Sequence, residues 1–204
     1  MARLFVEEDS VFLNIPYDNR FKSLYVAYIV GLTELGLTPK ATLAIPGGVN
    51  RLDRIFALIQ SCRYSIHDLS RVQIDRTPPP TPRFNMPLEL GLAIAWTKLT
   101  PSSHTWFVSE SVERRAQKSM SDLNGTDFNI HNGSPEGVMR ELCNAFVRRE
   151  HRPTVPKMMR SYRALVNIMP TIKLNSGTQN VFTATMFEDL ITAAAYIRDK
   201  ARDS

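Results

Sequence analysis

The run Val11-Phe-Leu-Asn-Ile15 is short, almost wholly apolar and followed by a longer amphipathic segment over residues 21–37. Apolar side chains in that segment recur with a roughly helical period, and Gly36 near its end suits a helix stop. A buried strand followed by a helix is the unit from which parallel sheets with helical crossovers are built. The stretch therefore predicts an α/β fold.

The same alternation continues to residue 149. Four further runs predict strands over residues 41–45, 64–69, 105–109 and 126–130, the first of them broken by Pro46-Gly-Gly48. The segments between them predict four helices: one capped by Asn50, one over 88–96 that is apolar nearly all round and so expected to be buried, one over 113–120, and one over 135–149 capped by Ser134. Five strands interleaved with helices predict a flavodoxin-like, doubly wound sheet of about five mostly parallel strands.

Two segments break this pattern. Residues 70–87 include five prolines, and because proline lacks a backbone donor this segment is expected to be a loop. Residues 150–156 hold two more and are typical of a linker, beyond which helices are expected over 155–169 and 181–202. The predicted organisation is an α/β domain, residues 1–149, followed by a C-terminal helical extension, residues 150–204.

Composition narrows the class of protein. With 43% hydrophobic and 22% charged residues the chain is expected to fold compactly. The net charge of +5 is spread thinly, which argues against a nucleic-acid partner. No apolar run approaches the roughly 18 residues of a membrane span and the N-terminus is acidic, so a cytoplasmic protein without membrane contact is expected. Cys62 and Cys143 stand alone, which supports neither a disulfide framework nor a metal site.

Ligands of such sheets bind outside the carboxyl ends of the strands, which directs attention to residues 14–20, 67–70, 83–91 and 109–110. Glu89 stands out because its carboxylate lies at the start of an otherwise apolar helix. Burial would raise its pKa, while the helix N-terminus and Arg83 would lower it, a tension typical of working carboxylates. The alternative is that Glu89 only caps its helix, with Asn85 or Met86 as the N-cap residue.

Other candidates surround these strand ends. Asp68 is expected to point into the crevice and accept from a ribose hydroxyl, or else to close an Asx turn. Asp18 and Arg20 are expected to contact phosphate or sugar, or to cap the first helix and pair with each other. His67 is expected to be structural and to face away from the crevice, because strand neighbours alternate faces, and His131 is a further candidate.

Several common enzyme classes are excluded by missing motifs. The sequence holds no GxGxxG, GxxxxGK[ST], HExxH or GxSxG pattern. This removes the usual dinucleotide dehydrogenases, P-loop proteins, zincins and serine hydrolases with a nucleophile elbow.

Three segments carry a resemblance to a known group: Val11 to Asp18, Ser65 to Ser70, and Phe84 to Ala93. Together they resemble the nucleoside 2-deoxyribosyltransferase-like and TIR-like (Toll/interleukin-1 receptor-like) proteins, many of them bacterial, which have flavodoxin-like domains. In that group a Glu within a pattern like E-[IL]-G-x-A is the catalytic carboxylate, and residues 89–93, Glu-Leu-Gly-Leu-Ala, match it position by position. The chain departs from the deoxyribosyltransferases, which usually place an Asp and Gly-Thr before the Glu, where residues 85–87 stand here.

The resemblance implies N-glycosidic chemistry. A carboxylate below the anomeric carbon stabilises or traps the oxocarbenium ion, so Glu89 would be nucleophile or electrostatic stabiliser. Asp68 would orient ribose hydroxyls, while the substrate-binding residues would be Tyr17, Asp18, Arg20, Ser70, Arg83, Phe84 and Asn85. Among these, Tyr17 or Phe84 would stack on the base. No metal or cofactor is expected, with nicotinamide adenine dinucleotide (NAD) or a related nucleotide as the substrate. The leaving group of NAD is already cationic, so no general acid is needed beside Glu89.

Three functions follow from these expectations. The first is an N-ribosyl hydrolase or transferase acting on a nucleotide such as NAD, with the C-terminal helices mediating self-association or contact with a partner protein, as in defence or signalling systems. The second is a non-catalytic TIR-like module that binds a nucleotide or a protein, with the proline-rich loop as a docking surface. The third is a deoxyribosyltransferase of nucleotide salvage. The first two differ in whether Glu89 and Asp68 face one open pocket.

Overall fold

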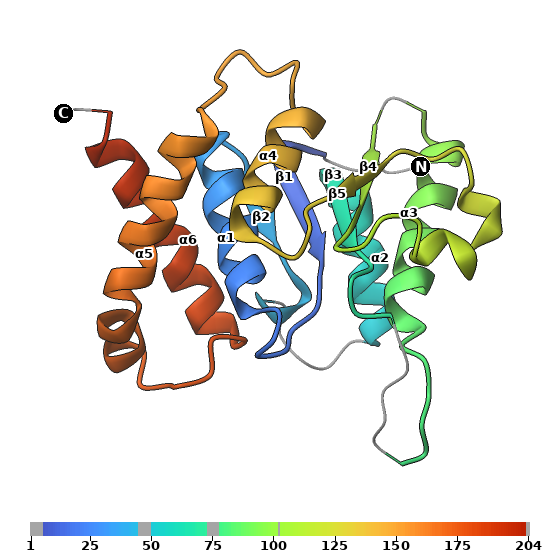
Figure 1. Ribbon diagram of the computed structural model, residues 1–204, viewed down its shortest axis with the longest axis horizontal. Coiled ribbons are helices and arrows are strands. Elements are labelled where there is room, and N and C mark those ends of the chain that lie inside the picture. Colours follow the sequence, from blue (N-terminus) through green and yellow to red (C-terminus); the bar gives the residue numbers. More distant parts are fainter. Residues whose placement is uncertain (1–5, 45–49, 73–77, 102, 203–204) are drawn as a thin grey trace.

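A computed structural model of the chain describes residues 6–44, 50–72, 78–101 and 103–202 (Figure 1). Its centre is a five-stranded sheet in the order β2-β1-β3-β4-β5, in which every pair of neighbours is parallel. The strands are β1 (Glu7–Asn14), β2 (Thr38–Lys40), β3 (Cys62–Asp68), β4 (Thr105–Glu110) and β5 (Phe128–Ile130). This is the flavodoxin-like order, with its switch point between β1 and β3, so the predicted fold class is confirmed.

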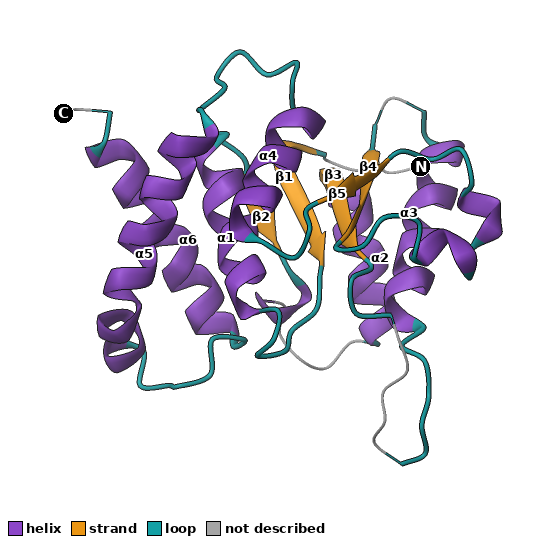
Figure 2. Ribbon diagram, viewed as in Figure 1, coloured by secondary structure: helices purple, strands orange, loops and turns teal. Residues whose placement is uncertain are grey.

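Helices cover both faces of the sheet (Figure 2). One face carries α2 (Arg51–Ser61) and α3 (Asn85–Leu99), and the other carries α1 (Lys22–Glu34) and α4 (Pro135–Ala145). The C-terminal helices α5 (Val155–Asn175) and α6 (Ala184–Lys200) form a further layer over α1. Both predicted caps are present: the Asn50 side chain accepts from Leu52 N at 2.9 Å, and the Ser134 hydroxyl accepts from Gly137 N at 3.0 Å.

Helix α1 lies at the centre of the largest core. Every residue from Leu24 to Glu34 is buried, because the sheet and α4 cover one side of the helix and α5 and α6 cover the other. Residues of the extension, such as Leu165 and Phe187, belong to the same apolar cluster as Val11 and Leu13 of β1. Helices α5 and α6 therefore supply part of the hydrophobic core of the α/β unit.

The second strand differs from the prediction. It covers residues 38–40, whereas residues 42–44 form a 3-10 turn; Ile45, residues 46–48 and residues 73–77 of the proline-rich segment lie outside the described residues. Pro39 lies within this strand. The strand lies at the edge of the sheet and pairs only with β1, where a missing backbone donor is tolerated.

Three helix predictions also need correction. Residues 113–120 form only a 3-10 turn over Ala116–Lys118, because Arg114 adopts a φ of 60° that interrupts a helix. The helix predicted over 135–149 ends at Ala145, and α5 continues to Asn175 with Pro170 inside it.

Helix α3 is not buried all round as predicted. Its buried residues form one stripe, whereas Leu88 and Leu99 are 56% and 77% exposed. The reason is its position: α3 is an outer helix that meets the sheet and α2 with one face and packs near the 3-10 turn at Ala116, while Leu88 and Leu99 stay exposed.

Among the described residues no helix has the length and apolar character needed to cross a membrane. Cys62 and Cys143 are both free thiols.

Candidate active site

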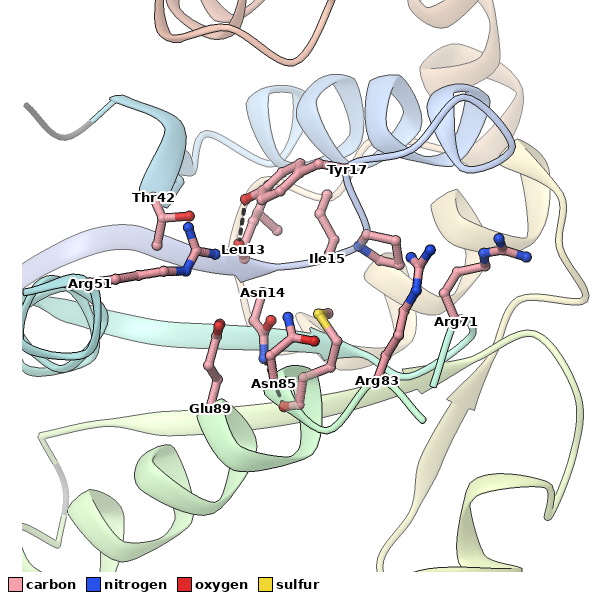
Figure 3. Close-up of a pocket in the computed structure, with 12 residues that line it drawn as sticks. Leu13, Asn14, Ile15, Tyr17, Thr42, Arg51, Arg71, Arg83, Asn85 and Glu89 are labelled. Atoms are coloured by element: carbon pink, nitrogen blue, oxygen red, sulfur yellow. Dashed lines mark hydrogen bonds between the residues drawn. The ribbon is translucent and has the colours of Figure 1, made fainter. Parts of the chain in front are cut away.

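A cavity of about 80 Å³, partly open to solvent, lies at the carboxyl end of β1 beside the switch point (Figure 3). Residues from five segments line it: the end of β1 and the loop after it, the turn after β2, the start of α2, the loop after β3, and the start of α3. The lining side chains include Asn14, Tyr17, Thr42, Arg51, Arg71, Arg83, Asn85, Met86 and Glu89. This is the edge at which doubly wound sheets bind ligands.

Glu89 is buried beside this cavity and rises from α3 toward Arg51 (Figure 3). It is the fifth residue of α3, which begins at Asn85 after Phe84, and no acidic residue stands in the first turn. Glu89 is thus too far along the helix to cap it, so the alternative of a capping glutamate does not hold. Burial raises the pKa of Glu89 to about 7, and Arg51 partly offsets that rise.

Two further lining residues come from a strand end that was not among the predicted site segments: Thr42 stands in the turn after β2, and Arg51 begins α2. Tyr17 lies beside them, and its hydroxyl donates to the carbonyl of Leu13 at 3.2 Å. Burial raises the pKa of Tyr17 well above its ordinary value, and the charge of Glu89 adds to the rise, so Tyr17 is a neutral phenol. The strand-end rule, applied to every strand, would have pointed to Thr42 and Arg51.

Two arginines occupy the opposite end of the cavity from Arg51 (Figure 3). Oδ2 of Asp18 accepts from Arg71 Nε at 3.2 Å and lies 3.4 Å from Arg83 Nη1. Its Oδ1 accepts from the backbone N–H groups that precede α1, at 3.0 and 3.2 Å. Asp18 therefore holds both guanidinium groups in place, while the Arg20 side chain is exposed and outside the lining.

Asp68 occupies a different place from the one expected. Its carboxylate is fully buried on the α1 side of the sheet, where the Tyr28 hydroxyl donates to it at 2.8 Å and His131 Nε2 lies at 2.9 Å. Ser70 N donates to its other oxygen at 2.9 Å. Burial alone would raise the pKa of Asp68, but hydrogen bonds from His131 and Ser70 outweigh it and hold the pKa below its ordinary value.

The structure therefore separates Asp68 from Glu89. Neighbouring residues of β3 do alternate faces, as predicted, but the cavity lies on the face opposite Asp68. His67, expected to face away from the crevice, instead contacts Asn14 of the cavity lining, with 2.9 Å between His67 Nδ1 and Asn14 Nδ2. The expected structural character of His67 is confirmed, since it is fully buried and hydrogen-bonded.

Ser70 and His131 belong to the Asp68 cluster and do not form a nucleophile and base. Nδ1 of His131 accepts from Gly133 N at 3.0 Å, so Nε2 carries the proton and donates. Ser70 Oγ lies 3.1 Å from that same nitrogen, which leaves His131 no lone pair with which to activate Ser70.

Of the other predicted residues, Tyr17, Arg83 and Asn85 line the cavity, whereas Phe84 is 70% exposed and outside it. The described ranges contain no group of three or more His, Cys, Asp or Glu side chains placed to hold a metal ion.

Comparisons with protein-family models, with curated proteins and with solved structures found no match.

Proposed function

We propose that the cavity cleaves the N-glycosidic bond of a nucleotide, most simply NAD, with Glu89 as the catalytic carboxylate. The observation that carries this proposal is a carboxyl group 4% exposed, with a pKa raised to about 7, in a cavity that it shares with three arginines. Among the described residues none is hydrogen-bonded to the Glu89 carboxylate, and a buried carboxylate that faces a cavity in this way is poised to meet positive charge.

Glycosidic cleavage develops such a charge at the anomeric carbon. The bond between that carbon and the pyridinium nitrogen breaks, and its electron pair neutralises the nicotinamide. Glu89 stabilises the resulting oxocarbenium ion or bonds to it as an ester, and a water molecule then adds its oxygen to the carbon and releases a proton. Glu89 acts in its ionised form, which Arg51 favours by lowering its pKa.

The remaining lining residues suit the rest of a nucleotide. Arg71 and Arg83 present guanidinium groups at the end of the cavity away from Arg51, which suits a phosphate. At about 80 Å³ the enclosed space is well below the roughly 300–1,000 Å³ of a typical ligand site, so only the sugar end of the substrate would be enclosed. In this proposal Asp68 is a positioning residue, since its bonds to Ser70 hold the start of the loop that carries Arg71.

We also propose that the C-terminal helices α5 and α6 mediate self-association or contact with a partner protein. A groove of about 650 Å³ between α5 and α6, lined by Tyr196, Ile168, Lys157 and Arg160 among others, supports self-association or a partner protein at these helices. In that case glycosidic activity would rise more steeply than linearly with protein concentration.

The alternative is a non-catalytic nucleotide- or protein-binding module of TIR-like type. It is favoured by the separation of Asp68 from Glu89, because the two carboxylates do not face one open pocket. It is also favoured by the apolar side chains of Phe84 and Leu88, which stand exposed at the start of α3. A deoxyribosyltransferase is the third reading, and it would exchange free bases between deoxynucleosides.

The decisive experiment is nicotinamide release from NAD by the wild-type protein and by Glu89→Gln, at low and high protein concentration. Glu113→Gln is the matched control, because that side chain is 73% exposed and remote in sequence from the lining. We expect release by wild type and control, and a fall of roughly 1,000-fold in Glu89→Gln. Equal release by wild type and Glu89→Gln would refute the catalytic assignment, and no release by any variant would favour the binding module.

A further inference from the structure

A line of hydrogen-bonded, buried polar side chains runs across β1 and β3 to the residue before β4, and one end of it lies at the cavity. It runs from Asn14 Nδ2 to His67 Nδ1 at 2.9 Å, from His67 Nε2 to Ser65 Oγ at 2.8 Å, and from Ser65 Oγ to His104 Nε2 at 2.9 Å. His104 Nδ1 then meets the carbonyl of Cys62 at 2.8 Å. All four side chains belong to residues no more than 3% exposed, so each hydrogen-bonding atom must find its partner within the protein.

At the Asn14 end of this line, the donors and acceptors of the hydrogen bonds can be assigned. Asn14 Nδ2 lies 3.1 Å from the backbone carbonyl of Met86, which is only an acceptor. The nitrogen of the Asn14 amide must therefore face Met86, and its second hydrogen is donated to His67. A flipped amide would set the Asn14 oxygen against the carbonyl oxygen of Met86.

The far end independently requires the same direction. Burial lowers the pKa of His104 and lowers that of His67 to about 3, so both rings are neutral. His104 must donate through Nδ1 to the Cys62 carbonyl, which leaves Nε2 to accept from the Ser65 hydroxyl. The Ser65 oxygen then accepts from His67 Nε2, and His67 Nδ1 accepts from Asn14. Every donor meets an acceptor only when all members point this way.

The consequence appears in the cavity. With its nitrogen held by two acceptors, the Asn14 amide turns its oxygen toward the space that Glu89 also lines (Figure 3). The cavity thus contains a hydrogen-bond acceptor that cannot exchange roles with a donor, unlike an asparagine on a protein surface. A ligand matched to it must supply a donor at that point.

We infer that Asn14 is a specificity-determining residue whose fixed amide oxygen accepts from the 2-hydroxyl of a bound ribosyl group, and that His67, Ser65 and His104 hold it in that orientation. The choice of sugar rests on the proposed function. In a cavity of about 80 Å³, a sugar whose anomeric carbon meets Glu89 brings the hydroxyl of the adjacent carbon nearest to the other lining groups. The site therefore selects ribosyl over 2-deoxyribosyl substrates.

The donor and acceptor assignment along this line of side chains is tested without any assay of activity. A long-range proton–nitrogen spectrum of the histidine rings is expected to show His67 protonated at Nε2 and His104 at Nδ1, with the His67 ring unchanged from pH 8 to pH 5. The side-chain amide hydrogens of Asn14 are expected to exchange slowly with solvent. The opposite tautomer at His67 would overturn the inference whatever the protein does to NAD.

The choice of sugar is tested by calorimetric binding of ribose 5-phosphate and 2-deoxyribose 5-phosphate. One hydrogen bond predicts about a tenfold preference for the ribose compound in the wild type, lost in Asn14→Ala. His67→Leu is expected to lose the preference and His67→Asn, whose oxygen replaces the Nδ1 acceptor, to retain it. The control is His151→Gln, because His151 is exposed and does not belong to the line of hydrogen-bonded side chains.

The outcomes separate this inference from the proposed function. Equal binding of the two sugars, or none of either, would overturn the role given to Asn14. The expected tautomers and sugar preference together with no cleavage of NAD would instead reject NAD as substrate and leave the role of Asn14 standing. If His67→Leu does not fold, Ser65→Ala replaces it. This variant removes the hydrogen-bond link one residue further from Asn14 and is expected to reduce the preference for ribose 5-phosphate.

Discussion

Two buried carboxylates on opposite faces of the sheet have opposite chemistry. Asp68 and Glu89 are 0% and 4% exposed, so solvent is removed from both almost equally. Asp68 is surrounded by Tyr28, His131 and Ser70 N, and its pKa falls. Glu89 faces a cavity with Arg51 as its main electrostatic partner, and its pKa rises to about 7. With burial nearly equal, the hydrogen-bond and charge partners decide in which direction the pKa of each carboxyl moves.

The largest effect on stability is expected at Asp68. Asp68→Asn places an amide where three donors converge, and should lower the free energy of unfolding by about 3–5 kcal/mol. The folded-state pKa of Asp68 lies below its unfolded value, so this stabilisation is complete above the unfolded pKa and is lost as the pH falls through the folded one. Urea unfolding from pH 5 to pH 8 should therefore give a constant difference. A difference below about 1 kcal/mol would mean that the cluster is not tightly bonded.

Glu89 should behave in the opposite way. Its folded-state pKa is raised from 4.5 to about 7, so the folded state binds more protons between these pH values and loses stability as the pH rises through them. Glu89→Gln is then expected to be more stable than the wild type by about 2–3 kcal/mol at pH 8, with the gap closing toward pH 4.5. Urea unfolding at pH 4.5, 6 and 8 measures this, with Glu113→Gln as control. A variant less stable than the wild type at pH 8 would contradict the raised pKa.

A substitution of Arg51 tests how much this one neighbour contributes to the difference between the pKa values of Glu89 and Asp68. Its charge lowers the pKa of Glu89, so Arg51→Gln should shift the titration of the Glu89 carboxyl to higher pH, by less than about one unit because Arg51 is exposed. Carbon-detected titration of labelled glutamate side chains reads this directly. If Glu89 is catalytic, the rise of kcat/KM with pH should move in the same direction. A downward shift would show that Arg51 is not the group that opposes desolvation.

The smallest effect is expected on the outer face of α3. Leu88 is 56% exposed and lies one residue before Glu89, so Leu88→Gln should change the free energy of unfolding by no more than about 0.5 kcal/mol. Thermal unfolding and nicotinamide release are the measurements. A loss of release without a loss of stability would show that this surface takes part in activation.

The fold was predictable because its signals are local. The alternation that begins at residues 11–15 recurs along the chain, and Asn50 and Ser134 cap their helices as expected. Glu89 was also predictable, since a carboxylate in an apolar helix is a local anomaly. Strand β2 was not predicted, because a proline such as Pro39 argues against a strand in the interior of a sheet but is tolerated in an edge strand.

The rest of the site depends on pairings that the sequence does not contain. In a parallel sheet covered on both faces, strand residues are apolar on both sides, so alternation cannot tell which face holds the cavity. That is why Asp68 and His67 were assigned to the wrong sides. Arg51, Arg71 and Asn14 gather around Glu89 only through the strand order.

The position of α1 has a consequence for synthesis on the ribosome. About 120 residues separate the end of α1 from the start of α5, which covers its outer side. At roughly 5–20 residues per second, translation leaves that apolar side uncovered for about 6–24 s in every nascent chain. During this interval the emerging protein is a client for chaperones, and a ribosome that stalls before residue 155 would release a chain prone to aggregate.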